Sequence, residues 1–288
     1  MTTSDHVRWL SDPTLRRPAL IAGFSGWNDA ADASSTAVRT LVEAWHAQPL
    51  AEIDPEEFTD FATVRPSVKL EDGRTRTIVW PTVSMWWAST PGSDVILVLG
   101  PEPSLRWRLF TEQIVSVAAR YEASVVLSLG ALLADVPHNR PVQVIGTAND
   151  DATIERFGLQ RSRYEGPTGI VGVLQDACTQ HGIPAASLWA AVPAYASQIP
   201  SPKAASALLS RAGEIIGTPA PLVALHNDVV RYEERVDEMV EDDEDLAEYV
   251  SRLDTMADEV DDDADTDDAD DVSSIADEVE RFLREQEN

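Results

Sequence analysis

The chain has 288 residues, of which 43% are hydrophobic, and a formal net charge of −28, which suits one large domain or one domain with a small appendage. The charge is uneven, because residues 1–226 carry 23 acidic and 17 basic side chains, whereas residues 227–288 carry 27 acidic and 5 basic ones. The negative electrostatic field of this chain repels phosphate backbones and anionic lipid surfaces, which argues against nucleic acid and membrane partners. It favours a partner protein with a basic surface.

Cysteine content and the first residues indicate the compartment. Cys178 is the single cysteine, so no intrachain disulfide is possible and a reducing environment is expected. Residues 1–10 lack an apolar signal-peptide core, and no run of about 18 apolar residues occurs. We therefore expect a cytoplasmic protein.

Short apolar segments alternate with helical patterns through residues 19–216. The strand candidates are 19–23, 94–100, 124–130, 142–146 and 187–193, and the helical patterns cover 30–47, 104–122, 168–180 and 202–216. Continuous apolar strands separated by helices predict an α/β domain at 1–220, with a mostly parallel sheet covered on both faces. Between residues 53 and 88, shorter β-like runs around a turn at 71–74 predict an antiparallel excursion.

A different pattern begins at residue 221. Apolar residues recur every three or four positions over 222–239 and again over 246–260, with the acidic run 241–245 between them. One helix of about 39 residues would be about 58 Å long, so we predict a helical hairpin at 221–260 that turns near 241–245.

The last residues form two further segments. The Asp/Ala-rich stretch 261–271 predicts a disordered acidic linker. Residues 272–288 predict a short amphipathic helix. Its apolar face supplies the candidate partner-binding residues Ile275, Val279, Phe282 and Leu283. Docking on its own domain, on a sister subunit or on a foreign partner all remain open.

Polar residues follow the predicted strands, where ligands bind in open α/β sheets. The ligand-binding candidates are Asn28, Asp29, Glu102, His138, Arg140, Tyr164 and Tyr195. Four of them have a structural alternative. Asn28 or Asp29 fits the cap of the next helix, His138 fits a hydrogen bond that anchors its loop, and the segment around Tyr164 fits a rigid turn.

Known catalytic patterns are missing from the sequence. Neither a dinucleotide-binding glycine motif nor a P-loop occurs, and Trp27 stands where a nucleophile elbow around Ser25 needs glycine. Five histidines and one cysteine lack zinc-ligand spacing. We predict no catalytic residue, no metal and no cofactor.

Several segments, taken together, carry a family resemblance. They are GFSGWNDAADAS at 23–34, FATVRP at 61–66, LGPEPSLRWRLF at 99–110, LGALLADVPHNRPV at 129–142, YEGPTGI at 164–170, VPAYASQIPSPKA at 192–204 and EVERFLRE at 278–285. The set resembles the proteasome assembly chaperone 2 family in its actinobacterial branch.

That resemblance implies a three-layer α/β/α sandwich, similar to nucleoside-phosphorylase-like folds, with a small helical part after it. It also implies help in assembling proteasome core particles, and it brings no agreed catalytic residues. Two departures stand out. Ala194 occupies a position where the family motif V-P-H-Y has histidine, and residues 286–288 lack the hydrophobic–Tyr–X ending of eukaryotic relatives.

Two functions follow as hypotheses. The leading one is a non-catalytic assembly chaperone or scaffold, homo-oligomeric, with protein partners that include proteasome subunits. Its rival is a small-molecule-binding protein or enzyme that holds a nucleoside- or nucleotide-type ligand among the seven candidates above.

Overall fold

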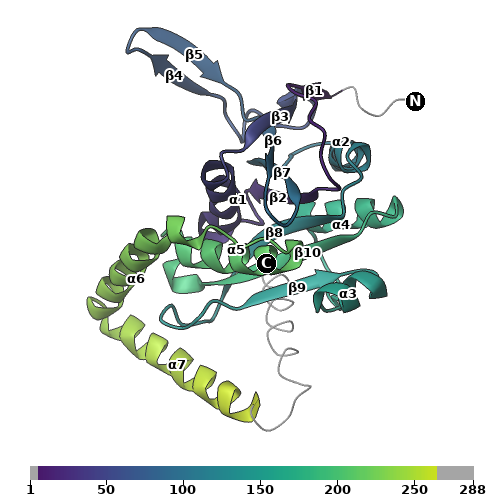
Figure 1. Cartoon of the computed structure of the whole chain (residues 1–288). Helices are drawn as coiled ribbons and strands as arrows, with labels where there is room; N and C mark the ends of the chain where they lie inside the picture. Colours follow the sequence, from purple (N-terminus) through teal and green to yellow (C-terminus); the bar gives the residue numbers. More distant parts are fainter. Residues whose placement is uncertain (1–5, 265–288) are drawn as a thin grey trace.

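A computed structural model describes residues 6–264. Its main body is an eight-stranded sheet in the order β1-β3-β6-β7-β2-β8-β10-β9 (Figure 1). The central strands β7, β2, β8 and β10 run parallel, and the outer strands are antiparallel to their neighbours. The strands are β1 (Val7–Trp9), β2 (Ala19–Ser25), β3 (Gln48–Ile53), β6 (Val83–Ser89), β7 (Asp94–Pro101), β8 (Val125–Ala134), β9 (Val144–Ala148) and β10 (Ala185–Pro193).

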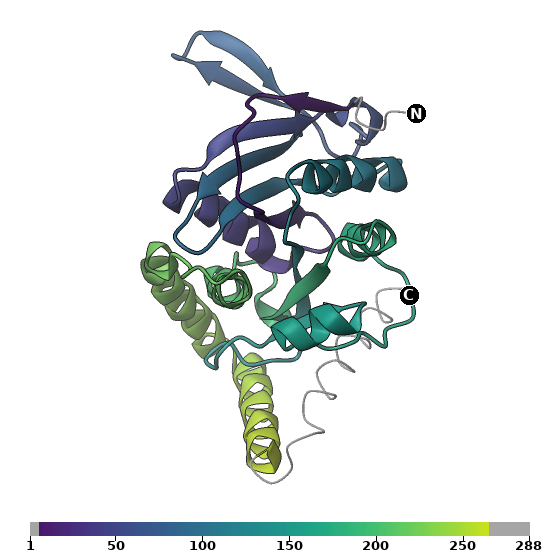
Figure 2. The same ribbon diagram turned by 45° about the vertical axis from the view of Figure 1, so that its right-hand side comes forward.

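Helices cover both faces of the sheet (Figure 2). On one face lie α1 (Ala33–Ala44) and α5 (Pro202–Ile216), and on the other lie α2 (Trp107–Arg120) and α4 (Ile170–Gln180). The position of β2 between the two helix layers explains why its sequence is apolar throughout. Ile21 packs into the α1–α5 layer and Leu20 into the α2–α4 layer, so neither set of alternating side chains meets water.

The fold prediction is confirmed, since the chain forms an α/β/α sandwich around a parallel sheet centre. The sequence did not indicate β1, β3 or the short helix α3 (Asp151–Phe157). The helix expected from residue 30 begins later, at Ala33, because Ala31 and Asp32 take left-handed backbone angles within a short 3-10 turn, η1 (Ala30–Asp32).

The excursion between β3 and β6 is a separate two-stranded sheet, β4 (Ser67–Glu71) and β5 (Thr75–Val79). Figure 1 shows this hairpin projecting away from the body. Every residue of β4 and most of β5 are exposed, so the strands pair with each other and cover no core.

Two helices follow the sandwich, α6 (His226–Glu241) and α7 (Glu244–Ala264). The break between them falls within the acidic run that predicted it. There the Asp243 carboxylate caps α7 by accepting the backbone N–H groups of Asp245 and Leu246 at 3.0 and 3.1 Å. The helices diverge from the break, so that the hairpin is open (Figures 1 and 2).

Helix α7 runs to Ala264, four residues into the segment expected to be a linker. The rest of that segment, and the terminal residues Ile275, Val279, Phe282 and Leu283, lie outside the described residues. Within residues 6–264, no helix has the length and apolar character that crossing a membrane requires.

Candidate functional site

The parallel strands bring six of the seven candidates to one edge of the sheet. Strands β2, β7, β8 and β10 all end there, and Asn28, Asp29, Glu102, His138, Arg140 and Tyr195 lie in the segments that follow them. Five of these residues form two groups, one around Glu102 and one around His138, and Asp29 contacts the start of α1.

Glu102 joins three elements in the first group. Its Oε1 accepts hydrogen bonds from the Asn28 side-chain amide at 2.7 Å and from the backbone N–H of Ile170, the first residue of α4, at 2.8 Å. The approach is close, because a Cβ on Gly169 would lie 2.1 Å from Asn28 Oδ1. Asn28 is fully buried, whereas Glu102 is partly exposed.

Asp29 has the capping role that the sequence offered as its alternative. Its Oδ1 accepts the backbone N–H groups of Ser34 and Ser35, at 2.7 and 3.1 Å, and the Ser34 hydroxyl at 2.7 Å. Because Asp32 makes no side-chain cap at the start of α1, Asp29 satisfies these first-turn donors instead.

His138 forms the centre of the second group and is buried. Its backbone N–H donates to the Tyr195 hydroxyl oxygen at 2.8 Å, its Nδ1 lies 2.8 Å from the same oxygen, and its Nε2 lies 2.8 Å from Asp237 Oδ1 on α6. A neutral imidazole satisfies both side-chain contacts in one tautomer, in which Tyr195 donates to Nδ1 and Nε2–H donates to the carboxylate.

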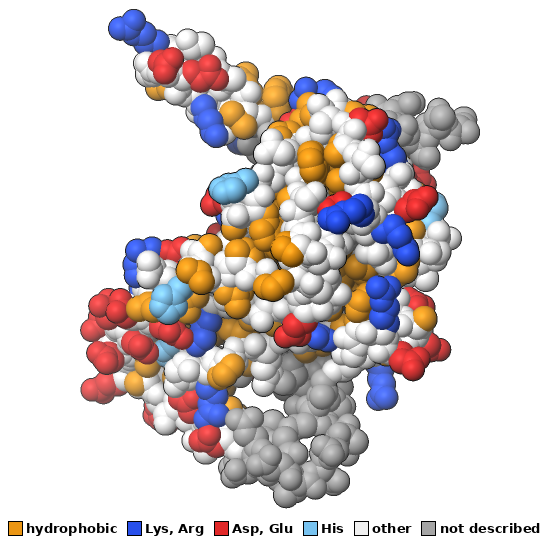
Figure 3. Space-filling model, in the orientation of Figure 1, with side chains coloured by type: hydrophobic (Ala, Val, Ile, Leu, Met, Phe, Trp, Pro, Cys, Tyr) orange, Lys and Arg blue, Asp and Glu red, His pale blue; other side chains and the backbone are white. Residues whose placement is uncertain are grey.

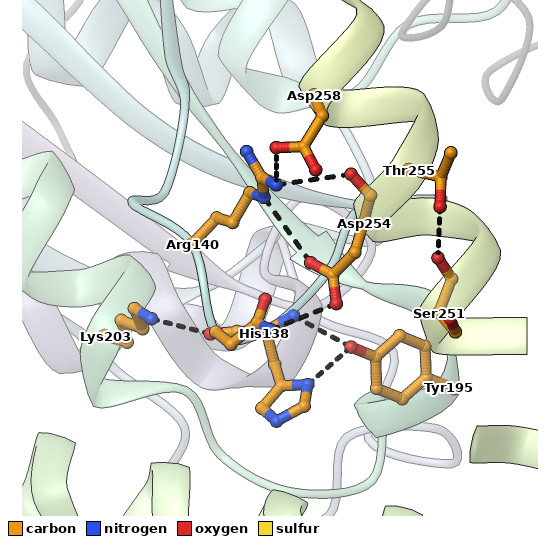
Figure 4. Close-up of polar contacts among 9 residues, drawn as sticks. His138, Arg140, Tyr195, Lys203, Ser251, Asp254, Thr255 and Asp258 are labelled. Carbon is orange, nitrogen blue, oxygen red and sulfur yellow. Dashed lines mark hydrogen bonds and ion pairs between the residues drawn. The ribbon is translucent and has the colours of Figure 1, made fainter. Parts of the chain in front are cut away.

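Arg140 connects the same loop to α7 (Figure 4). Its guanidinium pairs with Asp254, with Nε 3.4 Å from Oδ1, and with Asp258. The Asn139 amide donates to Asp254 Oδ2 at 3.1 Å. A loop that follows β8 is thereby attached to both C-terminal helices.

Further contacts extend this attachment. Lys203 on α5 donates to the His138 carbonyl at 2.6 Å and pairs with Glu233 on α6 at 2.6 Å. Tyr249 on α7 donates to Asp135 Oδ1 at 2.7 Å. We call this set of contacts the helix clamp. It joins the loop 135–140, Tyr195 and Lys203 to helices α6 and α7.

Tyr164 lies in the loop that leads into α4, whose first residue, Ile170, donates to Glu102. The Tyr164 hydroxyl donates to the carbonyl of Pro167 at 2.8 Å, inside its own loop. This contact agrees with the rigid turn that was the alternative to a ligand role.

The Tyr195 hydroxyl is the hydrogen-bond donor at the centre of the second group. Burial raises the pKa of the Tyr195 hydroxyl well above its usual value, so the group stays protonated and remains a donor. Among the described residues, no cluster of three or more histidine, cysteine or acidic side chains has the geometry to hold a metal.

Sequence reasoning missed the partners that make up the clamp. Lys203 lies within the predicted helical segment 202–216, and Asp237, Asp254 and Asp258 lie within the predicted hairpin 221–260. One usable signal was the spacing of Asp254 and Asp258, because residues four apart share a helix face and so reach one arginine together.

Comparison with known proteins identifies the family to which this fold belongs. The family profile described as the PAC2 family matches residues 23–240. The chain belongs to the PAC2 family. No curated protein matches the sequence.

Solved structures of several proteins are similar over most of the chain. A PAC2 family protein from Streptomyces avermitilis is 44% identical, with a TM-score of 0.75 and coverage of 81% of this chain and 99% of that one. A Mycobacterium tuberculosis proteasome-assembly chaperone homologue is 45% identical, with a TM-score of 0.73 and the same coverage. A Pyrococcus furiosus archaeal proteasome activator, at 16% identity, a TM-score of 0.67 and coverage of 81% and 97%, shares the fold.

Proposed function

We propose that this PAC2 protein is a non-catalytic assembly chaperone or scaffold that acts by binding other proteins. The observation that carries the proposal is the helix clamp. Of the residues expected to receive a small ligand, His138 contacts Asp237 of α6, Arg140 pairs with Asp254 and Asp258 of α7, and the Tyr195 ring packs edge-on against Tyr249 of α7. Polar groups used in this way hold an acidic surface in place on the sandwich.

Family membership supports the choice of partner. One relative is described as a proteasome-assembly chaperone homologue, and proteasome subunits are therefore our proposed partners. We further propose a cytoplasmic homo-oligomer and place the partner contact on Ile275, Val279, Phe282 and Leu283, whose sequence pattern predicts one apolar helical face.

A capture experiment tests this function. The tagged full-length chain is incubated with purified proteasome α and β subunits of the same organism, before and after core-particle assembly. We expect capture of unassembled subunits, and at least a tenfold loss of capture for the double variant Phe282→Ser, Leu283→Ser. Glu285→Gln, a change at a polar position of the same segment, serves as the matched control. Failure of the unmodified chain to capture any proteasome subunit overturns the proposal.

One observation favours the small-ligand alternative. Among the described residues, Asn28 Oδ1 and Asp29 Oδ2 are buried acceptors without a hydrogen-bond partner, and buried acceptors need a donor. A nucleoside or nucleotide could supply one. A thermal-shift panel of such ligands decides the matter, because a ligand at 100 times its Kd adds about 2.7 kcal/mol of stability. No shift across the panel removes this alternative for those classes.

A further inference from the structure

The β4–β5 hairpin has one apolar face that nothing in the described structure covers. Val68 pairs with Ile78 and Leu70 pairs with Arg76 across the two strands, so these four side chains share a face. Val68, Leu70 and Ile78 are 58%, 61% and 56% exposed. An isolated two-stranded hairpin is marginally stable in water, and a patch of this kind marks an interaction site.

The net charge of the hairpin indicates what kind of surface it binds. The segment 65–80 carries Arg65, Lys69, Arg74 and Arg76 against Glu71 and Asp72, a net charge of +2 in a chain of net −28. The hairpin therefore suits an acidic surface. Figure 3 shows acidic side chains gathered over the region of α6, on the left flank of the molecule and well below the hairpin.

A groove on α6 provides such a surface. Its volume is about 630 Å³, and it lies between α6 and the segment that leads into α5. Ile199, Pro200 and Pro202 line its apolar side. Among its charged residues, Arg231 is paired with Asp228, whereas Glu234 and Glu238 stand beside Arg235 as further lining residues. Residues 226–241 together carry six acidic and two basic side chains.

We propose that the hairpin of one copy docks in the α6 groove of a second copy. The apolar face would cover the proline-rich side, and Arg76 would approach Glu234 and Glu238. The hairpin lies beyond the β3–β6 end of the sheet, and α6 lies beside α5 at the other end (Figures 1 and 3). A hairpin therefore does not reach the groove of its own chain. The contact joins two different surfaces, so repeating it produces a ring or a filament.

Sedimentation velocity of the full-length chain at micromolar concentration tests the proposal. We expect an oligomer whose association constant falls at least tenfold for Arg76→Glu, for Glu238→Arg and for the triple variant Val68→Ser, Leu70→Ser, Ile78→Ser. Lys69→Glu is the matched control, because it makes the same charge change on the opposite face of the hairpin and should leave association within about twofold. Circular dichroism and thermal unfolding check that each variant keeps its folded body.

The decisive measurement is the association of two different charge variants when they are mixed. Arg76→Glu and Glu238→Arg chains, each impaired alone, restore opposite charges at the contact when combined, and should associate with each other at least tenfold more tightly than either does with itself. Four outcomes overturn the proposal. They are a chain that is monomeric throughout, Lys69→Glu as damaging as Arg76→Glu, sensitivity to hairpin changes alone (which indicates hairpin-to-hairpin pairing), and loss of association on deletion of residues 265–288.

Discussion

Cys178 lies on the face of α4 that packs against the sheet, and it has no exposed surface. Burial raises the pKa of its thiol to about 12, because the apolar surroundings disfavour the thiolate. The thiolate is the reactive form of cysteine. The burial that packs Cys178 against the sheet therefore also makes its thiol unreactive.

We predict that the folded protein reacts with a thiol-specific reagent at pH 8 about a thousandfold more slowly than a free cysteine, which has a pKa of about 8.5. Urea should restore the ordinary rate. A Ser251→Cys variant, with its added thiol at an exposed position of α7, is the control and should react at once. Fast labelling of the unmodified folded chain would contradict the prediction.

Asp94 begins β7 and its side chain is only 2% exposed. The Arg16 guanidinium donates to both of its carboxylate oxygens, at 3.2 and 2.8 Å, and the Arg16 backbone N–H donates at 2.7 Å. The hydrogen bond from the Arg16 side chain lowers the pKa of the Asp94 carboxyl. Its contribution to stability is therefore present above the unfolded-state pKa, about 3.9, and is lost as the pH falls through the lower folded-state pKa.

Asp94→Asn should lower the free energy of unfolding at pH 7 by about 1–2 kcal/mol, and the deficit should shrink as the pH falls below about 4. Urea titrations at a series of pH values measure this dependence. Asp72→Asn changes an exposed aspartate in the hairpin turn and should cost nothing measurable at any pH. A deficit that stays constant down to pH 3 would rule out the charged form as its source.

At the level of elements, α6 and α7 are attached to the sandwich in different ways. Helix α6 buries Tyr232 and Val236 in a small cluster with Ala196. Helix α7 buries Val250 and Leu253, and the ion pairs of Arg140 with Asp254 and Asp258 hold it to the loop after β8. Half-exposed ion pairs contribute little each, so α7 should open more readily than the sheet.

Removing both acidic partners of Arg140, in Asp254→Asn, Asp258→Asn, should cost the docking of α7 about 0.5–1 kcal/mol. Amide hydrogen exchange in α7 should then accelerate by about two- to fivefold, while β2 and β8 exchange as before. A matched double variant, Glu244→Gln, Glu248→Gln, alters exposed acids of the same helix. Equal acceleration in that control would show that helix charge, and not Arg140, determines the effect.

For the whole molecule, the sequence predicts the sandwich and the edge of the sheet where polar residues follow the strands. Both predictions rest on local signals, namely apolar runs and the residues at strand ends. The sequence did not indicate β3, whose residues Gln48 and Pro49 break the apolar pattern, or which side chains would meet. The pairing of His138 with Asp237 spans 99 residues, and such contacts depend on where α6 is placed, which no local pattern encodes.

The acidic balance of the whole chain leads to a further expectation. With a sequence pI of about 4.3, the net charge approaches zero near that pH, and self-repulsion disappears with it. We predict a solubility minimum near pH 4.3, measured as the polyethylene glycol concentration at half precipitation between pH 3.5 and 8. A minimum above pH 6 would show that the acidic residues are largely neutralised by a bound partner or ion.

The helix clamp has a mechanical consequence. A pulling force applied through the C-terminal side reaches α7 first, where it loads the Arg140 pairs, then the Tyr249–Asp135 bond and the Asp237–His138 bond one after another. The parallel strands β7, β2, β8 and β10 share their load across many hydrogen bonds at once. Under tension the helices would therefore detach at low force while the sheet stayed folded, which would lengthen the molecule and expose the strand ends beneath them.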